Sequence, residues 1–249
     1  MAVRVSLVQN LFMVSVNDPR DAVLLNRWEI DEASGTIVVI DVLRAFTTAA
    51  CAFAAGAQSI YLVETVDEAL AFKAENSAAV AMGESHGLRP DGFDLSNSPG
   101  TVVAADLEGR IVVQCTSAGT AGAVAAAGAP TAWAASLVCA SATATYLSGE
   151  GHSEPSYLIT GCFVDSIDVT GEDDRLAARL IERVRRGLPK HAEETATALA
   201  STYEAERCRN LPPAHSHPDD VSIAADVDRF DFAMQIVTDD GRVRLECRA

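Results

Sequence analysis

The chain has 249 residues, of which 49% are apolar and 22% are charged, and its formal net charge is −16. This length allows one large domain or two closely packed smaller ones, and the composition excludes a disordered or fibrous chain. The strong negative charge argues against nucleic acid as a partner, because no basic stripe exists to neutralise phosphates.

The N-terminal segment predicts a strand rather than a targeting signal. Met1 to Asn10 forms a short alternating run with Arg4 inside it, and no signal h-region is present. No apolar run approaches the ~18 residues that cross a bilayer, so we expect no membrane partner. The six cysteines are scattered without CxxC spacing, as in a reduced protein. We therefore expect a cytoplasmic protein.

Short apolar strands alternate with alanine-rich helices over residues 1–165. The run IVVID at Ile37–Asp41 is typical of a buried strand that ends in a carboxylate. Ser98 and Pro99 have the order of a helix cap followed by the first helical residue. This alternation predicts an α/β fold with a largely parallel sheet of βα units. The expected strands are 37–41, 59–63, 78–82, 111–115, 131–135 and 157–160, and the expected helices are 45–55, 67–75, 118–127, 137–147 and one that begins near 98–99.

The pattern changes from Thr170 onward. A helix starts with Glu172, Asp173 and Asp174 and ends with arginines, which matches the helix dipole. We expect a second helix at Ala192–Arg207, then a loop rich in proline and histidine at 211–220, and strands at 234–237 and 242–246. These elements predict a smaller C-terminal α/β lobe, residues 166–249, packed against a first domain of residues 1–165.

Polar side chains gather where the predicted parallel strands end. Ligands bind at the carboxyl ends of such strands, where carboxylates suit Mg²⁺ and hydroxyl-plus-glycine turns suit phosphate. An anionic substrate would be repelled by this acidic protein unless a metal or arginines supplied local positive charge. The candidates at or near these ends are Asp41, Arg44, Glu84, Asp94, Asn97, Ser98, Thr116, Ser117, Gly119 and Thr120.

Each of these residues also has a simpler interpretation. An aspartate at a strand end, such as Asp41, is more often a helix cap than a catalyst. Thr116 and Ser117 could cap the following helix, and Glu172 and Asp173 could serve only the helix dipole. The joint placement of these residues at one sheet edge is what favours a site.

Familiar phosphoryl-transfer signatures are largely absent. No second aspartate follows Asp41 by two residues, and the residue six after Cys115 is Ala121 rather than arginine. The chain has no Arg-His-Gly motif, no GK[ST] loop and no complete dinucleotide fingerprint.

The chain instead resembles the 2-phosphosulfolactate phosphatase family over roughly residues 35–190. The motifs IVVIDVLRAFTTA, GESHG, GFDLSNSP, TSAGT and TGED, which begin at Ile37, Gly83, Gly92, Thr116 and Thr170, match that family in order and spacing. IDVLRA together with GFDL-NSP is a highly specific combination. The family arginine after Gly-Glu is Ser85 here, its TTNGT asparagine is Ala118, and its GFDLGNSP glycine is Ser96.

The resemblance implies a Mg²⁺-dependent phosphatase that hydrolyses 2-phospho-3-sulfolactate or a close analogue, a step towards coenzyme M. It also implies a two-lobed α/β fold assembled as a homo-oligomer. The catalytic residues that we predict are Asp41, Glu84 and Asp94. We expect the metal at Asp41, Glu84, Asp94, Glu172 and Asp173, and the substrate at Arg44, Asn97, Ser98, Thr116, Ser117, Gly119, Thr120 and Arg89.

Two questions stay open at this level. The phosphorus is attacked either by Asp41 or by water bound to the metal, and the missing second acid after Asp41 favours water. Arg89, four residues after Ser85, is predicted to replace the family arginine as an anion clamp, although a solvated loop arginine is the simpler alternative. The competing functions are a non-catalytic anion-binding relative and a structural oligomer subunit.

Overall fold

The structure is a computed structural model, and it describes residues 22–26, 29–30, 35–149, 154–161 and 171–249. The strand expected within Met1–Asn10 and Thr170 of the TGED motif lie outside the described residues. The strands are β1 (Val23–Asn26), β2 (Thr36–Ile40), β3 (Ser59–Val63), β4 (Val80–Gly83), β5 (Leu95–Ser96), β6 (Ile111–Cys115), β7 (Thr131–Ala135), β8 (Ser156–Ile159), β9 (Ala233–Asp239) and β10 (Arg242–Arg248).

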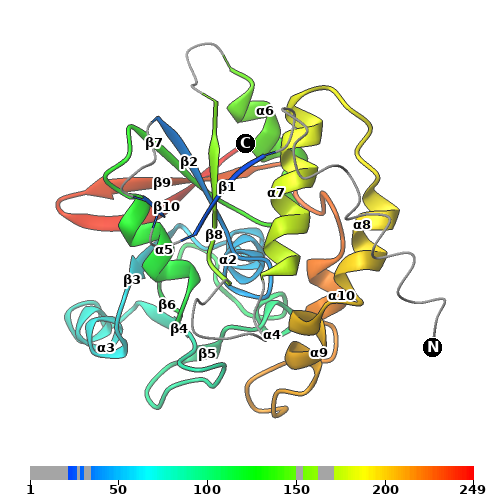
Figure 1. The fold of residues 1–249 in the computed structure, drawn as a ribbon. Helices are drawn as coiled ribbons and strands as arrows, with labels where there is room; N and C mark the ends of the chain where they lie inside the picture. The colour runs from blue at the N-terminus through cyan, green and yellow to red at the C-terminus, as the bar shows by residue number, and fades with distance from the viewer. Residues whose placement is uncertain (1–21, 27–28, 31–34, 150–153, 162–170) are drawn as a thin grey trace.

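The helices flank these strands largely as expected (Figure 1). Ser98 caps the short helix α4 by accepting a hydrogen bond from the Thr101 N–H, as its sequence position predicts. The helices are α2 (Ala45–Ala54), α3 (Val66–Glu75), α4 (Pro99–Val102), α5 (Gly119–Ala126), the 3₁₀ turn η2 (Leu137–Cys139), α6 (Ala140–Leu147), α7 (Glu172–Arg185), α8 (Ala192–Leu199), α9 (Tyr203–Arg209) and α10 (Asp220–Ala224).

The helix expected at Ala192–Arg207 is wrong, because the chain forms two helices there. α8 ends at Leu199, and Thr202 adopts an extended backbone and accepts a hydrogen bond from the Ala205 N–H. A threonine side chain that caps a new helix competes with continuation of the old one. The break gives α9 a direction of its own.

The described strands form one ten-stranded sheet in the order β1-β8-β2-β7-β9-β10-β3-β6-β4-β5. The strands β1, β8, β2 and β7 are mutually parallel, and we call them the first parallel group. The second parallel group is β3, β6, β4 and β5. The antiparallel hairpin β9–β10 joins the two groups. The prediction of a largely parallel α/β sheet is therefore confirmed.

The two parallel groups run in opposite directions along the sheet, because three successive antiparallel pairings separate them. In a flat sheet their carboxyl ends would lie at opposite edges. A sheet twists by roughly 20–25° per strand, so the six steps from β2 to β4 rotate the strands by roughly 120–150°. This twist compensates most of the reversal and turns both sets of carboxyl ends towards one side of the molecule.

Three of the four apolar clusters in the described residues pack against the sheet. The largest packs α2 and α5 against strands of both parallel groups, including Val39 of β2 and Ile60 of β3. Gln114 of β6 donates a hydrogen bond to the Ala45 carbonyl of α2 at 3.0 Å, so α2 lies between the groups. A second cluster packs α6 and α7 on the other face of the first group, and a third packs α3 on the second group.

The C-terminal strands lie at the centre of the sheet rather than at its edge. Leu245 of β10 pairs with Ile60, and Met234 of β9 pairs with Ala134. The division of the chain into residues 1–165 and 166–249 and the two-lobed shape stay predictions. Within the described parts, no helix is both long and apolar enough to cross a membrane. The five described cysteines are free, and all but Cys247 are buried.

Candidate active site

A cavity of about 280 Å³ lies where the loops after β2, β4, β6 and β8 meet the helices α7 and α9. It combines segments from both parallel groups, as the twist of the sheet allows. Its lining residues are Asp41, Leu43, Arg44, Glu84, His86, Gly87, Asn97, Ser117, Ala118, Gly161, Asp173, Asp174, Glu204, Arg207, Cys208 and Leu211.

Asp41 follows β2 directly and is 7% exposed. Its Oδ1 accepts a hydrogen bond from the Ala45 N–H at 2.8 Å, and its Oδ2 accepts one from the Thr160 hydroxyl at 3.3 Å. A Cβ atom at Gly119 would lie 2.6 Å from Oδ2, so only glycine lets the start of α5 approach so closely. Burial, with a contribution from the nearby charge of Glu84, raises the pKa of Asp41 to about 6.

Asp173 and Asp174 stand in the first turn of α7, and each is 2% exposed. They tie the loop after β2 to this helix, because Asp173 accepts from the Leu43 N–H and Asp174 accepts from the Val42 N–H. Burial and the neighbouring carboxylates raise the pKa of both well above the usual aspartate range. These acids therefore serve the loop after β2 as well as the helix dipole.

Three buried oxygen atoms of the lining residues have no hydrogen-bond partner. They are Oδ1 of Asn97, Oδ1 of Asp173 and Oε2 of Glu204. Unpartnered buried polar atoms are rare, and each requires an explanation such as an ion or a ligand. Carboxylate and amide oxygens are the donors that Mg²⁺ prefers.

The described residues hold no preassembled group of three or more His, Cys, Asp or Glu side chains around a metal position. This does not conflict with the donor chemistry, because Mg²⁺ commonly takes one or two carboxylates and completes its shell with water and substrate phosphate. The residues present therefore fit a magnesium ion.

Glu84 has a different environment, although it lines the same cavity. Its Oε1 accepts from the Ser117 N–H at 2.6 Å, and its Oε2 accepts from the Gly87 N–H at 2.5 Å and the Ser117 hydroxyl at 3.1 Å. Glu84 thus joins the loop after β4 to the loop after β6. The preceding Gly83 has φ +150°, and a Cβ atom there would lie 1.9 Å from the Cys115 carbonyl oxygen.

Thr116 and Thr120 bond mainly to each other. The Thr116 N–H donates to the Thr120 hydroxyl oxygen, and the Thr120 N–H donates to the Thr116 hydroxyl oxygen. Both side chains are buried and neither lines the cavity. They shape the turn that carries Ser117 and Ala118 to the cavity, whereas the Ser117 hydroxyl donates to Glu84 instead of capping α5.

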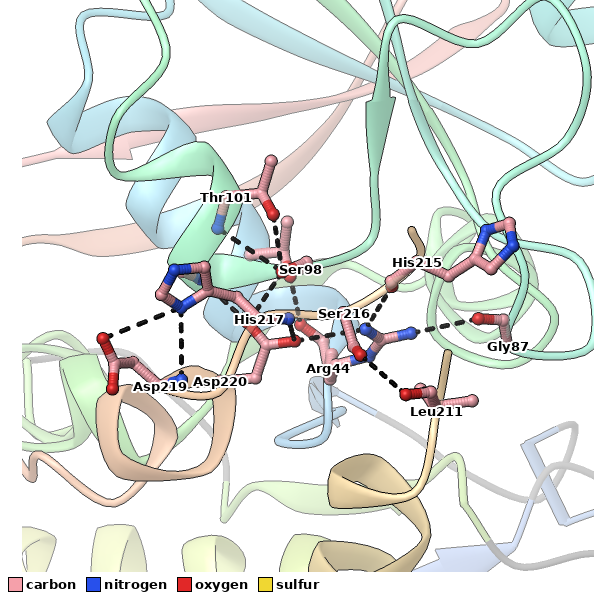
Figure 2. A network of polar contacts seen from close by, with 12 residues as sticks. Arg44, Gly87, Ser98, Thr101, Leu211, His215, Ser216, His217, Asp219 and Asp220 are labelled. Carbon is pink, nitrogen blue, oxygen red and sulfur yellow. Dashed lines mark hydrogen bonds and ion pairs between the residues drawn. The ribbon is translucent and has the colours of Figure 1, made fainter. Parts of the chain in front are cut away.

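Arg44 is 5% exposed and is held by three acceptors (Figure 2). Its Nη1 donates to the His215 carbonyl at 2.9 Å and to Asp220 at 3.3 Å, and its Nη2 donates to the Gly87 carbonyl at 3.3 Å. This one guanidinium therefore connects the loop after β2, the loop after β4 and the 211–220 segment.

Asp220 is the centre of that network and is 1% exposed. Its Oδ1 accepts from the Ser98 hydroxyl at 2.7 Å and the Gly100 N–H at 2.9 Å, and its Oδ2 accepts from Arg44 and the His217 N–H (Figure 2). Ser98 is thus used by Asp220 and by its own helix, and it does not line the cavity.

The structure brings six of the predicted site residues to the cavity, namely Asp41, Arg44, Glu84, Asn97, Ser117 and Asp173. Asp94 is not among the lining residues, because its Oδ1 pairs with Lys73 at 2.6 Å and its Oδ2 accepts from the Ala81 N–H. Arg89 donates from its guanidinium to the Asp94 carbonyl and is also outside the lining. Glu172 lies in the first turn of α7 without lining the cavity. The roles predicted for these three residues stay predictions.

Sequence reasoning missed Asp174, Glu204, Arg207 and Asp220 as residues of the site. Asp174 was visible only as one of three acids at a helix start, which is a common surface pattern. Glu204 and Arg207 fall in the last turn of the expected helix Ala192–Arg207, whereas in the structure both belong to α9, which begins after a break and lines the cavity. The placement of Asp220 in the expected loop gave no signal that it would pair with Arg44 across 176 residues.

The comparisons with known proteins agree on one family. The family model described as 2-phosphosulpholactate phosphatase matches residues 24–236. A protein of Thermus thermophilus named probable 2-phosphosulfolactate phosphatase is 47% identical over 91 residues, which cover 36% of this chain and 38% of the relative. A protein of Bacillus subtilis with the same name is 32% identical over 152 residues, which cover 60% of this chain and 64% of the relative. The matched segments thus span less than two thirds of either relative.

Proposed function

The chain belongs to the 2-phosphosulpholactate phosphatase family, and we propose that it is a Mg²⁺-dependent phosphatase that releases phosphate from 2-phospho-3-sulfolactate or a closely similar phosphorylated acid. The relatives' names and the family match support the substrate class. The cavity, at about 280 Å³, is close to the lower end of the usual size range of small-molecule sites.

The observation that carries the proposal is the group of unpartnered oxygens in the cavity. Asn97, Asp173 and Glu204 each leave one buried oxygen without a donor, and Asp41 stands beside Asp173 closely enough to raise its pKa. Burial of charged or polar groups without partners costs free energy that a structural role would not require. A cation-bound phosphate ester would satisfy these atoms.

We assign the metal to Asp41 and Asp173, with the unpartnered Asn97 oxygen as a further donor. A Mg²⁺ ion held by these residues would supply the positive charge that offsets the charge of the phosphoryl group. Glu84 is less suited to direct coordination, because its carboxylate already accepts three hydrogen bonds. Its contribution is to fix the loops that carry Gly87 and Ser117.

The phosphoryl group would rest against the start of α5. The N–H groups of Ala118 and Gly119 donate no hydrogen bond within the described parts of the structure, whereas the Ser117 N–H is taken by Glu84. Free N–H groups at a helix start bind phosphate readily. Gly119 also touches Asp41, so a phosphoryl group at this position would lie next to the Asp41 carboxylate.

Asp41 has two possible roles in the chemical step. With a pKa of about 6 it is largely ionised at pH 7, so it can attack phosphorus itself or accept the proton of an attacking water. Arg44 holds the loop after β2 in place, because its guanidinium joins that loop to the Gly87 and His215 carbonyls. If Asp41 accepts the proton of the attacking water, the P–O ester bond breaks as water adds, and that proton passes to the leaving oxygen to give the hydroxy acid and phosphate. If Asp41 attacks, the ester bond breaks as an aspartyl phosphate forms, the leaving oxygen takes a proton from solvent water, and a second water then hydrolyses the aspartyl phosphate to phosphate.

The test is phosphate release from a panel of phosphorylated hydroxy acids, measured with Mg²⁺ or with excess EDTA. We expect release from a substrate that carries further acid groups, loss of release in EDTA and recovery with Mg²⁺. Full activity in EDTA would refute the metal assignment. Tight binding of these acids without any phosphate release would instead favour a non-catalytic anion-binding relative.

A further inference from the structure

Five carboxylates and two arginines line the cavity. The carboxylates are Asp41, Glu84, Asp173, Asp174 and Glu204, and the arginines are Arg44 and Arg207. A substrate with several acid groups needs positive charge beyond the site of phosphoryl transfer, and the whole chain is strongly acidic. The arginine that is not already paired within the protein is therefore the one that can bind the remaining acid groups.

We propose that Arg207 binds the non-reacting acid group of the substrate and so sets the preference for multiply acidic phosphate esters over esters with an uncharged leaving group. This inference rests on the proposed function, since it names the specificity residue of the same cavity. It differs from the expectations that Arg44 binds the substrate and that Arg89 is the anion clamp.

The charge of Arg44 is already used inside the protein. Its partner Asp220 is 1% exposed, and the guanidinium also donates to the carbonyls of His215 and Gly87. A substrate anion that drew Arg44 away would leave Asp220 as an uncompensated buried charge, which is strongly unfavourable. Arg44 thus positions the loops of the cavity and contributes little free positive charge.

Arg207 has the opposite environment. It lies in α9, whose neighbouring residues Glu204 and Cys208 also line the cavity. Its guanidinium carbon lies 6.0 Å from the centre of the Tyr203 ring, and in the described parts of the structure it forms no ion pair or hydrogen bond. The side chain is exposed and lines the cavity, so it stands at the mouth. Its planar fork of donors matches a carboxylate or sulfonate.

Two other arginines provide matched comparisons. Arg209 lies on the same helix, but its Nη2 donates to the Ala200 carbonyl and it does not line the cavity. Arg89 lies in the loop after β4, and its guanidinium donates to the Asp94 carbonyl. Alanine at either position removes one positive charge, as Arg207→Ala does, without changing the lining of the cavity.

The experiment measures steady-state phosphate release with two substrates, 2-phospho-3-sulfolactate and 4-nitrophenyl phosphate, whose leaving group carries no acid. For Arg207→Ala we expect kcat/KM to fall roughly ten- to a hundred-fold with the first substrate, mainly through KM. We expect a change of no more than about two-fold with the second. Arg207→Lys should recover part of the loss, and Arg209→Ala should behave like the unmodified protein with both substrates.

An equal loss with both substrates, or a selective loss in Arg89→Ala rather than Arg207→Ala, would overturn the proposal. A direct binding measurement separates this proposal from the proposed function. Calorimetric titration with 3-sulfolactate, the unphosphorylated acid, should show binding to the unmodified protein and at least ten-fold weaker binding to Arg207→Ala. This result would support the role of Arg207 even if no phosphate were released, whereas unchanged binding would refute it.

Discussion

The two walls of the cavity use the same carboxylate chemistry in opposite ways. On the wall formed by the loop after β2 and by α7 and α9, Asp173 and Glu204 each keep one buried oxygen without a partner. On the wall formed by the loops after β4 and β6, Glu84 accepts three hydrogen bonds. We call these the acidic wall and the loop wall. The comparison distinguishes Asp173 and Glu204, which each have an oxygen available to a ligand, from Glu84, whose oxygens bond to the loops of the protein. All three residues line the same cavity.

The largest expected effect is on the acidic wall, at Asp41. Asp41→Asn should lower kcat/KM for phosphate release by roughly a thousand-fold, because the variant loses the charge next to the phosphoryl position. The asparagine oxygen can still accept the Ala45 N–H, and the buried ionisable carboxyl is gone, so the thermal midpoint should not fall. Measurement of both quantities distinguishes the roles. A variant that unfolds easily but keeps full activity in its folded fraction would restore the interpretation of Asp41 as a structural cap.

The loop wall should respond to an isosteric change by losing stability. Glu84→Gln places an amide NH₂ among the N–H and hydroxyl donors of Gly87 and Ser117, so at least one hydrogen bond is lost. We expect the free energy of unfolding to fall by about 1–3 kcal/mol. Urea titration measures this loss. Glu64→Gln, at an exposed glutamate outside the active-site cavity, is the control and should change stability by less than about 0.5 kcal/mol.

The same type of change on the acidic wall should raise the stability of the protein instead of lowering it. Asp173→Asn keeps an acceptor for the Leu43 N–H and replaces a carboxyl, whose ionisation is disfavoured by burial and by Glu204 and Asp41, with a side chain that cannot ionise. In metal-free protein at pH 7 we expect the thermal midpoint to rise by about 2–4 °C, which corresponds to roughly 1 kcal/mol at this chain length. A fall in the midpoint would show that the Asp173 carboxylate is needed by the fold.

The pH dependence of that stability has a definite sign. Burial raises the pKa of Asp41 to about 6 and that of Asp173 well above its usual range. An acid whose pKa is higher in the folded state binds protons more tightly there. For Asp41 this favourable contribution is present below about pH 4 and is lost as the pH rises through 6, and for Asp173 it is likewise lost as the pH rises. Thermal unfolding in EDTA from pH 4 to 8 measures this loss, and Asp173→Asn should flatten the curve.

The smallest effect is expected at Asp94, which lines neither wall. Its pairing with Lys73 is partly exposed, with Asp94 42% exposed, and such pairs contribute about 0–1 kcal/mol. Asp94→Asn should therefore change kcat/KM by no more than about three-fold, with Lys73→Ala as the matched variant. A loss of orders of magnitude in Asp94→Asn alone would support the metal or catalytic role that the sequence predicts.

The local elements of this fold could be predicted because each has a local cause. The run at Thr36–Ile40, the cap at Ser98 and the graded charges of α7 all act within a few residues. The order of strands in the sheet has no such cause. Nothing near residues 233–248 indicates that they pair with β7 on one side and β3 on the other.

The site could be predicted in part for the same reason. Asp41, Glu84 and Asp173 stand at the ends of recognisable elements, so a rule about strand and helix ends finds them. Arg207 and Asp220 depend on a helix break and on a pairing between distant segments. The same limits leave the homo-oligomer, Glu172 as a metal ligand and the substrate role of Thr116 and Thr120 as predictions.

The central position of the β9–β10 hairpin has a consequence for synthesis on the ribosome. Leu245 of β10 pairs with Ile60 of β3. The edge of β3 that faces β10 therefore has no partner until nearly the whole described chain has been made. At about 5–20 residues per second this interval lasts roughly 10–40 s. During that time β7 and β3 both present open sheet edges, which can pair with other chains. Truncation within residues 233–248 would make this temporary exposure permanent, and aggregation during expression should follow.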